Sequence, residues 1–430
     1  MIQSLSRRAF LGGAGATAAL TAWPPGAEAG ATPGFAFGPM STDVTPTSAL
    51  VWLSADQERS MSVQFARDPD FSDRRETAPL RVGSASDFTG LFRLNGLQPG
   101  TGYFYRGLSG DLMGAVGRFQ TPGLVAKPFS FAFSADHTAS MKPFDLYDRI
   151  AAQKPGFFLH LGDTAYTDWP RDEFRPSLAH YRFKHREVRA DRHLQDFLAR
   201  LLTYPVWDDH EVQNDFHRSN PYITMGRQAF LEYWPVVSSG GKILYRQFSW
   251  TPAADFILLD CRSYRGSKEE PDGPAKTMLG ATQKAWLKET LAASRAPFKF
   301  IVSSVPFSGP FGQDRWQGFA TEREEIRAFI TAQGIKGVVI LSADVHLALD
   351  IHREDGISEF VAGPIAAPTA CQMRFFARFR LMASRRFYIC DEPNYGLIRV
   401  HPESDPPRAE LSFLGMDNRV RHRVRIEAGR

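Results

Sequence analysis

The chain has 430 residues, of which 43% are hydrophobic, and a formal net charge of +4. This length predicts two or three domains with enough apolar content for a full core, and the small charge gives no indication of a nucleic-acid partner. Three cysteines are too few for a disulfide framework or a thiolate zinc site, although a single disulfide between Cys371 and Cys390 is possible.

Residues 1–29 predict an export signal. Arg7 and Arg8 form a twin-arginine pattern before a weakly apolar stretch, and Ala27 and Ala29 are small residues suited to cleavage. The pattern predicts a periplasmic or secreted protein that the twin-arginine export machinery carries folded and metal-loaded. A disordered leader with a chance arginine pair is the alternative. No other segment approaches 18 uninterrupted apolar residues, so no stable membrane insertion is predicted.

Residues 30–124 predict an all-β domain. Short alternating runs at 48–53, 61–65, 90–94 and 102–106 are separated by clusters of glycine, proline and aspartate. This spacing is typical of a β-sandwich of the immunoglobulin or fibronectin type. The region contains no acid–base constellation, so we expect it to have a structural role.

Residues 125–430 predict an α/β domain, because strand and helix patterns alternate there. The expected strands are 129–134, 156–161, 201–207, 256–259, 298–303 and 337–341. The expected helices are 143–153, 182–202, 280–294 and 321–333.

Polar residues able to bind metal follow four of the expected strands. They form the segments Asp136-His137, Asp163-Thr-Ala-Tyr166, Asp208-Asp209-His210-Glu211 and Asp344-Val-His346. A single aspartate after a strand is usually a turn or cap residue, but adjacent buried carboxylates repel unless a cation lies between them. Ligands of open α/β sheets bind beyond the carboxyl ends of strands, so we expect these four segments to converge.

The order of these motifs resembles the PhoD-like alkaline phosphatases of the calcineurin-like metallophosphoesterase superfamily. The resemblance includes Gly162-Asp163-x-x-Tyr166, Trp207-Asp-Asp-His-Glu211 and segments 259–265, 278–287, 341–346 and 394–397. It implies a fibronectin III-like β-sandwich followed by a four-layer α/β/β/α metallophosphoesterase domain. It also implies an enzyme that hydrolyses phosphate monoesters, diesters or both.

The resemblance implies two metal sites with different ligand sets. One comprises Asp136, Asp163, Tyr166 and His346, a mixed oxygen and nitrogen set that suits Fe(III). The other comprises Asp163, Asp209 and Asp344, an oxygen set that suits calcium, with magnesium or manganese as alternatives. Asp163 would bridge both cations, and Tyr166 is either a phenolate ligand or a packed aromatic side chain. The cations would activate a water molecule for attack on phosphorus.

Two residues are candidates for catalysis. His210 is expected to donate a hydrogen bond to the phosphate or a proton to the leaving group, or alternatively to orient Asp209. Arg262 is expected to bind the phosphate through two hydrogen bonds, with Arg265 as the other candidate. Pairing of either arginine with Asp260 or another carboxylate is the alternative.

The sequence departs from the family pattern in two places. Asp136 replaces the cysteine common in PhoD-like enzymes, and the role of the adjoining His137 stays open. Ser304 lies where superfamily members often have a histidine ligand, so this serine or a water would have to fill the position. Asn214 is either a further site residue or part of a surface loop.

Two arginine-rich segments have alternative interpretations. Segment 182–193 predicts a basic helix with a solvated face. Segment 373–382 interleaves arginine with phenylalanine, and it either lies over the site and favours large anionic or lipid diesters or packs as an ordinary amphipathic helix. The resemblance to PhoD-like enzymes also allows a phospholipase D-like phosphodiesterase on the same scaffold, which is the alternative enzyme. A non-catalytic surface binding protein is the alternative of another class.

Overall fold

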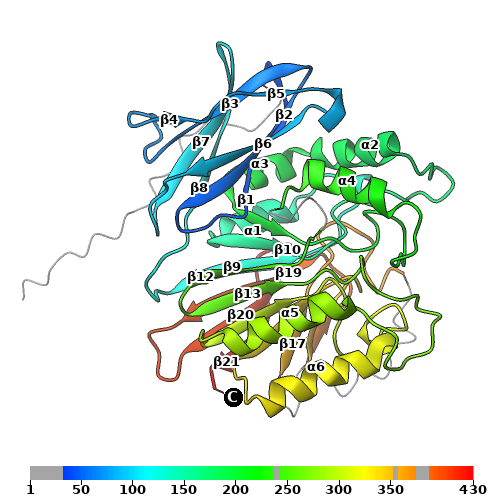
Figure 1. Ribbon diagram of the computed structural model, residues 1–430. Helices are drawn as coiled ribbons and strands as arrows, with labels where there is room; N and C mark the ends of the chain where they lie inside the picture. Colours follow the sequence, from blue (N-terminus) through cyan, green and yellow to red (C-terminus); the bar gives the residue numbers. More distant parts are fainter. Residues whose placement is uncertain (1–31, 237–242, 352–356, 374–386, 430) are drawn as a thin grey trace, which may run out of the picture.

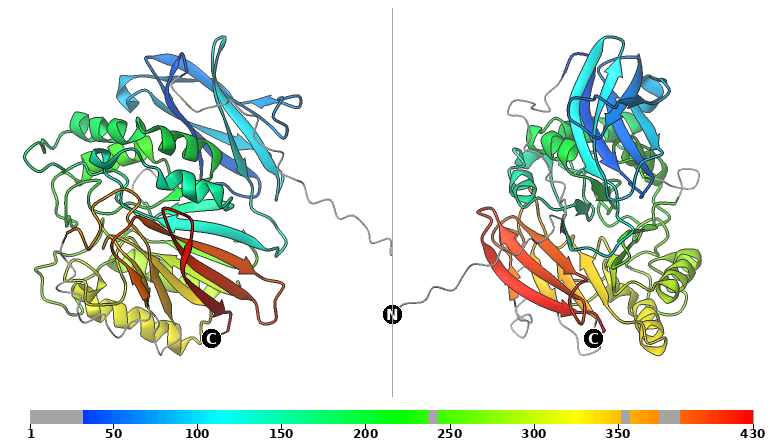
Figure 2. Two further views of the ribbon diagram at one scale, coloured as in Figure 1. Left: turned by 180° about the vertical axis from the view of Figure 1, so that it is seen from behind. Right: turned by 90° about the vertical axis from the view of Figure 1, so that its left-hand side faces the viewer.

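The computed structural model describes residues 32–236, 243–351, 357–373 and 387–429. The predicted signal at 1–29 and most of segment 373–382 lie outside the described residues. Figure 1 shows a β-sandwich at the top of the molecule, above a larger domain of two sheets and their helices. Figure 2 shows the sandwich and the larger domain from behind and from the side.

The β-sandwich is built from the first eight strands. They are β1 (Phe35–Thr42), β2 (Ser48–Ala55), β3 (Arg59–Ala66), β4 (Arg75–Glu76), β5 (Leu80–Val82), β6 (Thr89–Asn95), β7 (Gly102–Ser109) and β8 (Leu112–Gln120). One sheet has the order β1-β2-β6, and the other has β4-β3-β7-β8 with β5 beside β3. The hydroxyl of Tyr103 accepts the backbone N–H of Gln98 at 2.9 Å, which ties the corner before β7 to its strand.

The larger domain contains two mixed sheets. The first has the order β11-β10-β9-β19-β20-β21. Its strands are β9 (Phe129–Ser134), β10 (Phe157–His160), β11 (Thr203–Pro205), β19 (Asn394–His401), β20 (Arg408–Gly415) and β21 (Val420–Glu427). The second has the order β12-β13-β14-β15-β17-β16-β18. Its strands are β12 (Arg246–Thr251), β13 (Ala254–Leu258), β14 (Phe298–Val302), β15 (Val338–Ser342), β16 (Ala348–Ile351), β17 (Ser358–Val361) and β18 (Phe387–Ile389).

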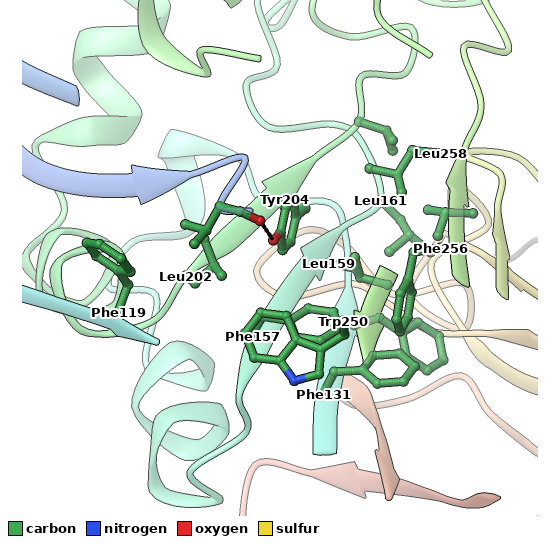
Figure 3. Close-up of a cluster of buried hydrophobic side chains, with 14 of the residues drawn as sticks. Phe119, Phe131, Phe157, Leu159, Leu161, Leu202, Tyr204, Trp250, Phe256 and Leu258 are labelled. Carbon is green, nitrogen blue, oxygen red and sulfur yellow. Dashed lines mark hydrogen bonds between the residues drawn. The ribbon is translucent and has the colours of Figure 1, made fainter. Parts of the chain in front are cut away.

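The two sheets pack face to face through an aromatic core (Figure 3). The ring of Phe131 in β9 lies 4.9 Å from Phe256 in β13 and 5.0 Å from Phe300 in β14, both edge to face. Phe131 also stacks on Phe157 of β10 at 5.2 Å. These large buried rings explain much of the chain's phenylalanine content and hold the two sheets at a fixed separation.

Helices cover both outer faces of the sheet pair. They are α1 (Leu146–Ala152), α2 (Leu178–Arg189), α3 (Arg192–Arg200), α4 (Ile223–Tyr233), α5 (Gly280–Ala293) and α6 (Ala320–Ala332), with short 3₁₀ turns at Ser84–Ser86, Ala139–Met141 and Trp316–Phe319. Apolar side chains of α1, α3 and α4 pack on the first sheet, and those of α5 and α6 pack on the second. The predicted sandwich and α/β/β/α arrangement are confirmed.

The prediction of one helix over residues 182–202 is wrong, because the chain forms two helices there. The α2 helix ends at Arg189, and Asp191 begins α3 by accepting the backbone N–H of Leu194 at 3.0 Å. An aspartate at this position satisfies a backbone donor that the new helix would otherwise leave unpaired. Among the described residues, no helix is long and apolar enough to cross a membrane.

Candidate metal centre

The expected site residues lie in tight loops directly after strands of the two sheets. Asp136 and Asp163 follow β9 and β10, and Asp344 and His346 follow β15. All four have positive φ angles, of 63°, 54°, 70° and 52° respectively. Residues other than glycine rarely adopt this left-handed conformation, and such backbone strain concentrates at functional sites. In this protein the left-handed backbone conformation directs these four polar side chains toward the same region.

Three overlapping groups of potential ligands contain the predicted residues. Within each group the ligand atoms lie within 4.8 Å of one another. The groups are Asp136 with Asp163 and His346, Asp163 with Asp209 and His210, and Asp208 with Asp209 and Asp344. Asp163 belongs to the first two groups and Asp209 to the last two, so the groups form a continuous cluster. Asp344 joins it through Asp209 rather than through Asp163.

Several carboxylate oxygens in this cluster are buried without a hydrogen-bond donor. Both side-chain oxygens of Asp136 and Oδ1 of Asp209 have no partner among the described residues. A buried carboxylate oxygen without a donor is costly, and a cation removes that cost. The donor set therefore fits metal ions.

The backbone leaves room for Asp136 only because residue 363 is glycine. A Cβ atom on Gly363 would lie 2.5 Å from Oδ2 of Asp136, and its φ of +140° is also unfavourable for other residues. Gly363 therefore keeps this carboxylate in its present position.

His346 is oriented through its second ring nitrogen. Its Nδ1 donates to the carbonyl oxygen of Pro368, which leaves Nε2 2.9 Å from the hydroxyl of Tyr166 and 3.9 Å from Oδ1 of Asp136. Metal-binding histidines are commonly held this way. Burial lowers the pKa of His346 to about 4, which favours the neutral ring that a metal requires. Burial and the nearby carboxylate of Asp163 raise the pKa of Tyr166, so its ionisation would need a neighbouring cation.

A disulfide lies close to this histidine. The predicted bridge between Cys371 and Cys390 is confirmed, and the third cysteine, Cys261, is buried. The backbone N–H of Ala370 donates to the carbonyl of His346 at 2.9 Å. The bridge therefore fastens the segment that holds His346.

His210 lies against Tyr166 and faces the cavity. Their rings stack with 4.0 Å between centroids, and Nδ1 of His210 is 2.6 Å from Oδ1 of Asp168. Burial would lower the pKa of His210, but the carboxylates of Asp209 and Asp168 raise it to about 9. The imidazole is therefore suited to donate a proton at neutral pH.

Arg262 does not have the predicted role of binding phosphate. Its side chain is 0% exposed, with Nε and Nη2 paired to Asp208 at 2.6 and 2.9 Å and Nη1 paired to Asp314 at 2.9 Å. Arg265 is also buried and pairs with Asp314. The alternative of carboxylate pairing is thus the observed one, with Asp208 and Asp314 as partners rather than Asp260.

The three residues left open by the sequence have different surroundings. Ser304 is buried and donates to Oδ1 of Asp208 at 2.6 Å, so its hydroxyl is engaged behind the centre. Nδ1 of His137 lies 2.8 Å from the hydroxyl of Tyr147 and 3.1 Å from Nε2 of His160, and the ring is buried. Asn214 lines the cavity in front of the centre.

The sequence analysis overlooked Arg315 and Asp168. Arg315 lies in the loop directly before the 3₁₀ turn at Trp316–Phe319, and its Nε donates to Oδ2 of Asp344 while its side chain lines the cavity. Arg315 thus brings a guanidinium to the cavity next to the predicted ligand Asp344, where Arg262 was expected to bind an anionic substrate. The adjacent charged residues Asp314 and Arg315 lie between aromatic residues in the sequence, and this pattern could have indicated site residues. They were not predicted because no strand pattern directly precedes them.

The comparisons with known proteins agree with this architecture. A family model described as PhoD-like phosphatase matches residues 131–401, and one described as its N-terminal domain matches residues 19–123. Alkaline phosphatase D of Bacillus subtilis (strain 168) is 27% identical over 418 residues, covering 80% of this chain and 71% of that protein. A solved structure described as "Structure of PhoD" has a TM-score of 0.79 and 21% identity, covering 91% of this chain and 89% of the other. The chain therefore belongs to the PhoD-like phosphatase family.

Proposed function

We propose that this phosphatase is an exported, metal-dependent hydrolase of phosphate monoesters and diesters. The observation that carries the proposal is the convergence of buried carboxylate oxygens without donors on a cavity lined by His210 and Arg315. In a protein of this family, such a cluster is best explained as the binding site of catalytic cations. The name of the Bacillus relative, alkaline phosphatase D, supports the same reaction class.

The ligand chemistry supports two cations of different character. Asp136, Asp163, Tyr166 and His346 would hold Fe(III), because a phenolate and an imidazole join the carboxylates there. Asp163, Asp209 and Asp344 would hold Ca²⁺, or alternatively Mg²⁺ or Mn²⁺. When bound, such a pair of cations supplies an activated water and neutralises charge on the phosphate.

The chain's own residues would complete the reaction. The guanidinium of Arg315 binds phosphate oxygens and stabilises their charge. Hydrolysis forms a bond between the water oxygen and phosphorus and breaks the bond to the ester oxygen. The protonated ring of His210 transfers its proton to that departing oxygen, and the proton of the attacking water returns to the solvent. Asp168 holds His210 in place through Nδ1.

The disulfide supports export to an oxidising compartment, where such bonds persist. The twin-arginine signal at 1–29 would direct this transport. Fusion of residues 1–35 to a reporter protein, with both arginines replaced by lysine as the control, tests this part. Retention of the native fusion in the cytoplasm would contradict it.

A combined assay and metal analysis tests the catalytic proposal. We expect the purified protein to contain iron and a divalent cation, to show a visible tyrosinate-to-iron absorption band, and to hydrolyse p-nitrophenyl phosphate or its bis ester. Higher turnover of phosphatidylcholine would favour the phospholipase D-like alternative. A folded, metal-loaded protein that hydrolyses none of these esters would favour the non-catalytic binding protein.

A further inference from the structure

The cavity in front of the metal centre is much larger than a phosphate group needs. Its volume is about 750 Å³, and its floor carries the side chains of Asp163, Tyr166, Asp209, His210 and His346. Cavities of roughly 300–1,000 Å³ enclose whole organic ligands. A bare phosphate on the floor would leave most of this space unfilled, so the walls are positioned to contact another part of the substrate.

The walls of this cavity are largely apolar. Trp169, Phe311 and Val345 line it, together with Pro310 and Pro368. Phe311 and Val345 are buried at 6% and 7% exposure and belong to one apolar cluster, so this wall is fixed by packing. Trp169 comes from the loop after Tyr166 and is 48% exposed. A large aromatic side chain left in solvent at the edge of a cavity is well suited to cover an apolar ligand.

The charged side chains near the wall of Phe311 and Val345 are paired within the chain, whereas Arg171 lines another part of the cavity. Lys268 lines the cavity but pairs with Asp215, and Asp314 beside it is paired with Arg262 and Arg265. Arg315, which pairs with Asp344 near the floor, would serve the reacting phosphate itself. An ester group against Phe311 and Val345 therefore meets apolar surface, and a polar or anionic group would have to reach Arg171 or the polar side chains elsewhere in the cavity.

We propose that this cavity selects phosphate esters that carry a large apolar or aromatic ester group, with Trp169 and Phe311 as its specificity-determining residues. The inference rests on the proposed function and names its substrate class. The phosphate lies on the floor beside Arg315, while the ester group lies between the ring of Trp169 and the wall of Phe311 and Val345. Burial of that group raises affinity in proportion to its apolar area.

The test compares Trp169→Ala with the native metal-loaded protein on bulky and small esters. The bulky substrates are bis(p-nitrophenyl) phosphate and a short-chain phosphatidylcholine, and the small substrate is methyl phosphate, whose hydrolysis is followed by the release of inorganic phosphate. We expect kcat/KM to fall at least about tenfold on one or both bulky substrates, mainly through KM, and to change less than about twofold on the small one. Whether the aryl or the lipid substrate is more affected identifies the source of the apolar group.

Two further variants make the comparison specific. Trp169→Phe should recover most of the loss, because it restores an aromatic face. Phe183→Ala should change neither substrate, because Phe183 is equally exposed, at 49%, but lies on α2 and does not line the cavity. Equal losses on small and bulky esters, or no loss on either, would overturn the inference while leaving the hydrolase itself intact.

Binding measurements separate this inference from the reaction. Phenylphosphonate and methylphosphonate are not hydrolysed, so their dissociation constants can be measured by calorimetry even if no ester is turned over. We expect phenylphosphonate to bind at least about tenfold more tightly, and Trp169→Ala to remove that difference. Tight binding without turnover would contradict the proposed function alone, and equal binding of both phosphonates would contradict the apolar site.

Discussion

Two buried acidic clusters lie side by side in this protein, and their negative charges are compensated in different ways. In the arginine–aspartate cluster, Asp208 and Asp314 are paired to the guanidinium groups of Arg262 and Arg265. In the open carboxylate cluster (Asp136, Asp163 and Asp209), oxygens of Asp136 and Asp209 have no protein donor among the described residues. The charges of the first cluster are compensated within the chain, whereas the open oxygens of the second favour the binding of cations. The two clusters adjoin, because Nη2 of Arg262 also lies 3.5 Å from Oδ2 of Asp209.

This contrast separates residues that we expect to stabilise the fold from residues that we expect to bind the cations. Loss of a partner in the arginine–aspartate cluster should damage stability, because it leaves a buried charge unpaired. Loss of a carboxylate in the open cluster should damage metal binding and turnover while leaving the metal-free fold intact. Four predictions follow this division, from the largest expected effect to the smallest.

Asp163→Asn should reduce turnover by at least about 10³-fold, because Asp163 is the carboxylate shared by two of the ligand groups. The metal-free variant should be as stable as the metal-free native protein, since burial and the repulsion from Asp209 raise the pKa of Asp163 and favour its neutral form. Activity assays and thermal unfolding with and without metal measure both effects. Residual activity near the native value would refute the shared role of Asp163.

Arg262→Met should lower the free energy of unfolding by about 3–5 kcal/mol, because Asp208 would lose its paired guanidinium. Arg265→Met is the matched control with a smaller loss, since Asp314 would still be paired with Arg262. Adding Asp208→Asn to Arg262→Met should recover part of the loss. Denaturant unfolding of the metal-free proteins gives these values, and an unchanged stability of Arg262→Met would refute the structural role.

Gly363→Ala should weaken metal binding about 10- to 100-fold, because the new Cβ would displace the carboxylate of Asp136. Gly334→Ala is the control, since Gly334 also has a positive φ, of +61°, but has no neighbouring atom within 4 Å. The control should lose only about 1 kcal/mol of stability, with unchanged metal affinity. Equal metal affinity in both variants would show that Asp136 can shift without consequence.

Metal affinity should rise with pH, by up to about tenfold per pH unit for each proton released. Burial and the carboxylate of Asp344 raise the pKa of Asp136 well above its ordinary value, so this group carries a proton that the cation displaces. At Asp136 the folded metal-free protein then binds more protons than the unfolded chain, so the contribution of this group to stability falls as the pH rises from about 4 through its raised pKa. Calorimetric titration in two buffers of different ionisation enthalpy measures the proton release. A pH-independent affinity would contradict the raised pKa.

The sequence by itself determined the motif segments and the family to which they lead. Apolar strands that end in Asp163 or in Asp208-Asp209-His210 are visible as local patterns, because burial and strand periodicity act within a few residues. The sandwich and the α/β class of the second domain follow from the same patterns, whereas the four-layer α/β/β/α arrangement was implied by the family resemblance. The break between α2 and α3 depends on a single capping aspartate within a continuous helical pattern, and the prediction missed it.

Only the tertiary structure decided how the charged side chains are partnered. Arg262 and Arg315 are both arginines near acidic residues, yet the first is enclosed by Asp208 and Asp314 and the second lines the cavity. His137 follows Asp136 directly but contacts Tyr147 in the helical layer. Electrostatic pairing depends on distance and burial among groups that lie far apart in the chain, and local sequence patterns carry no record of either.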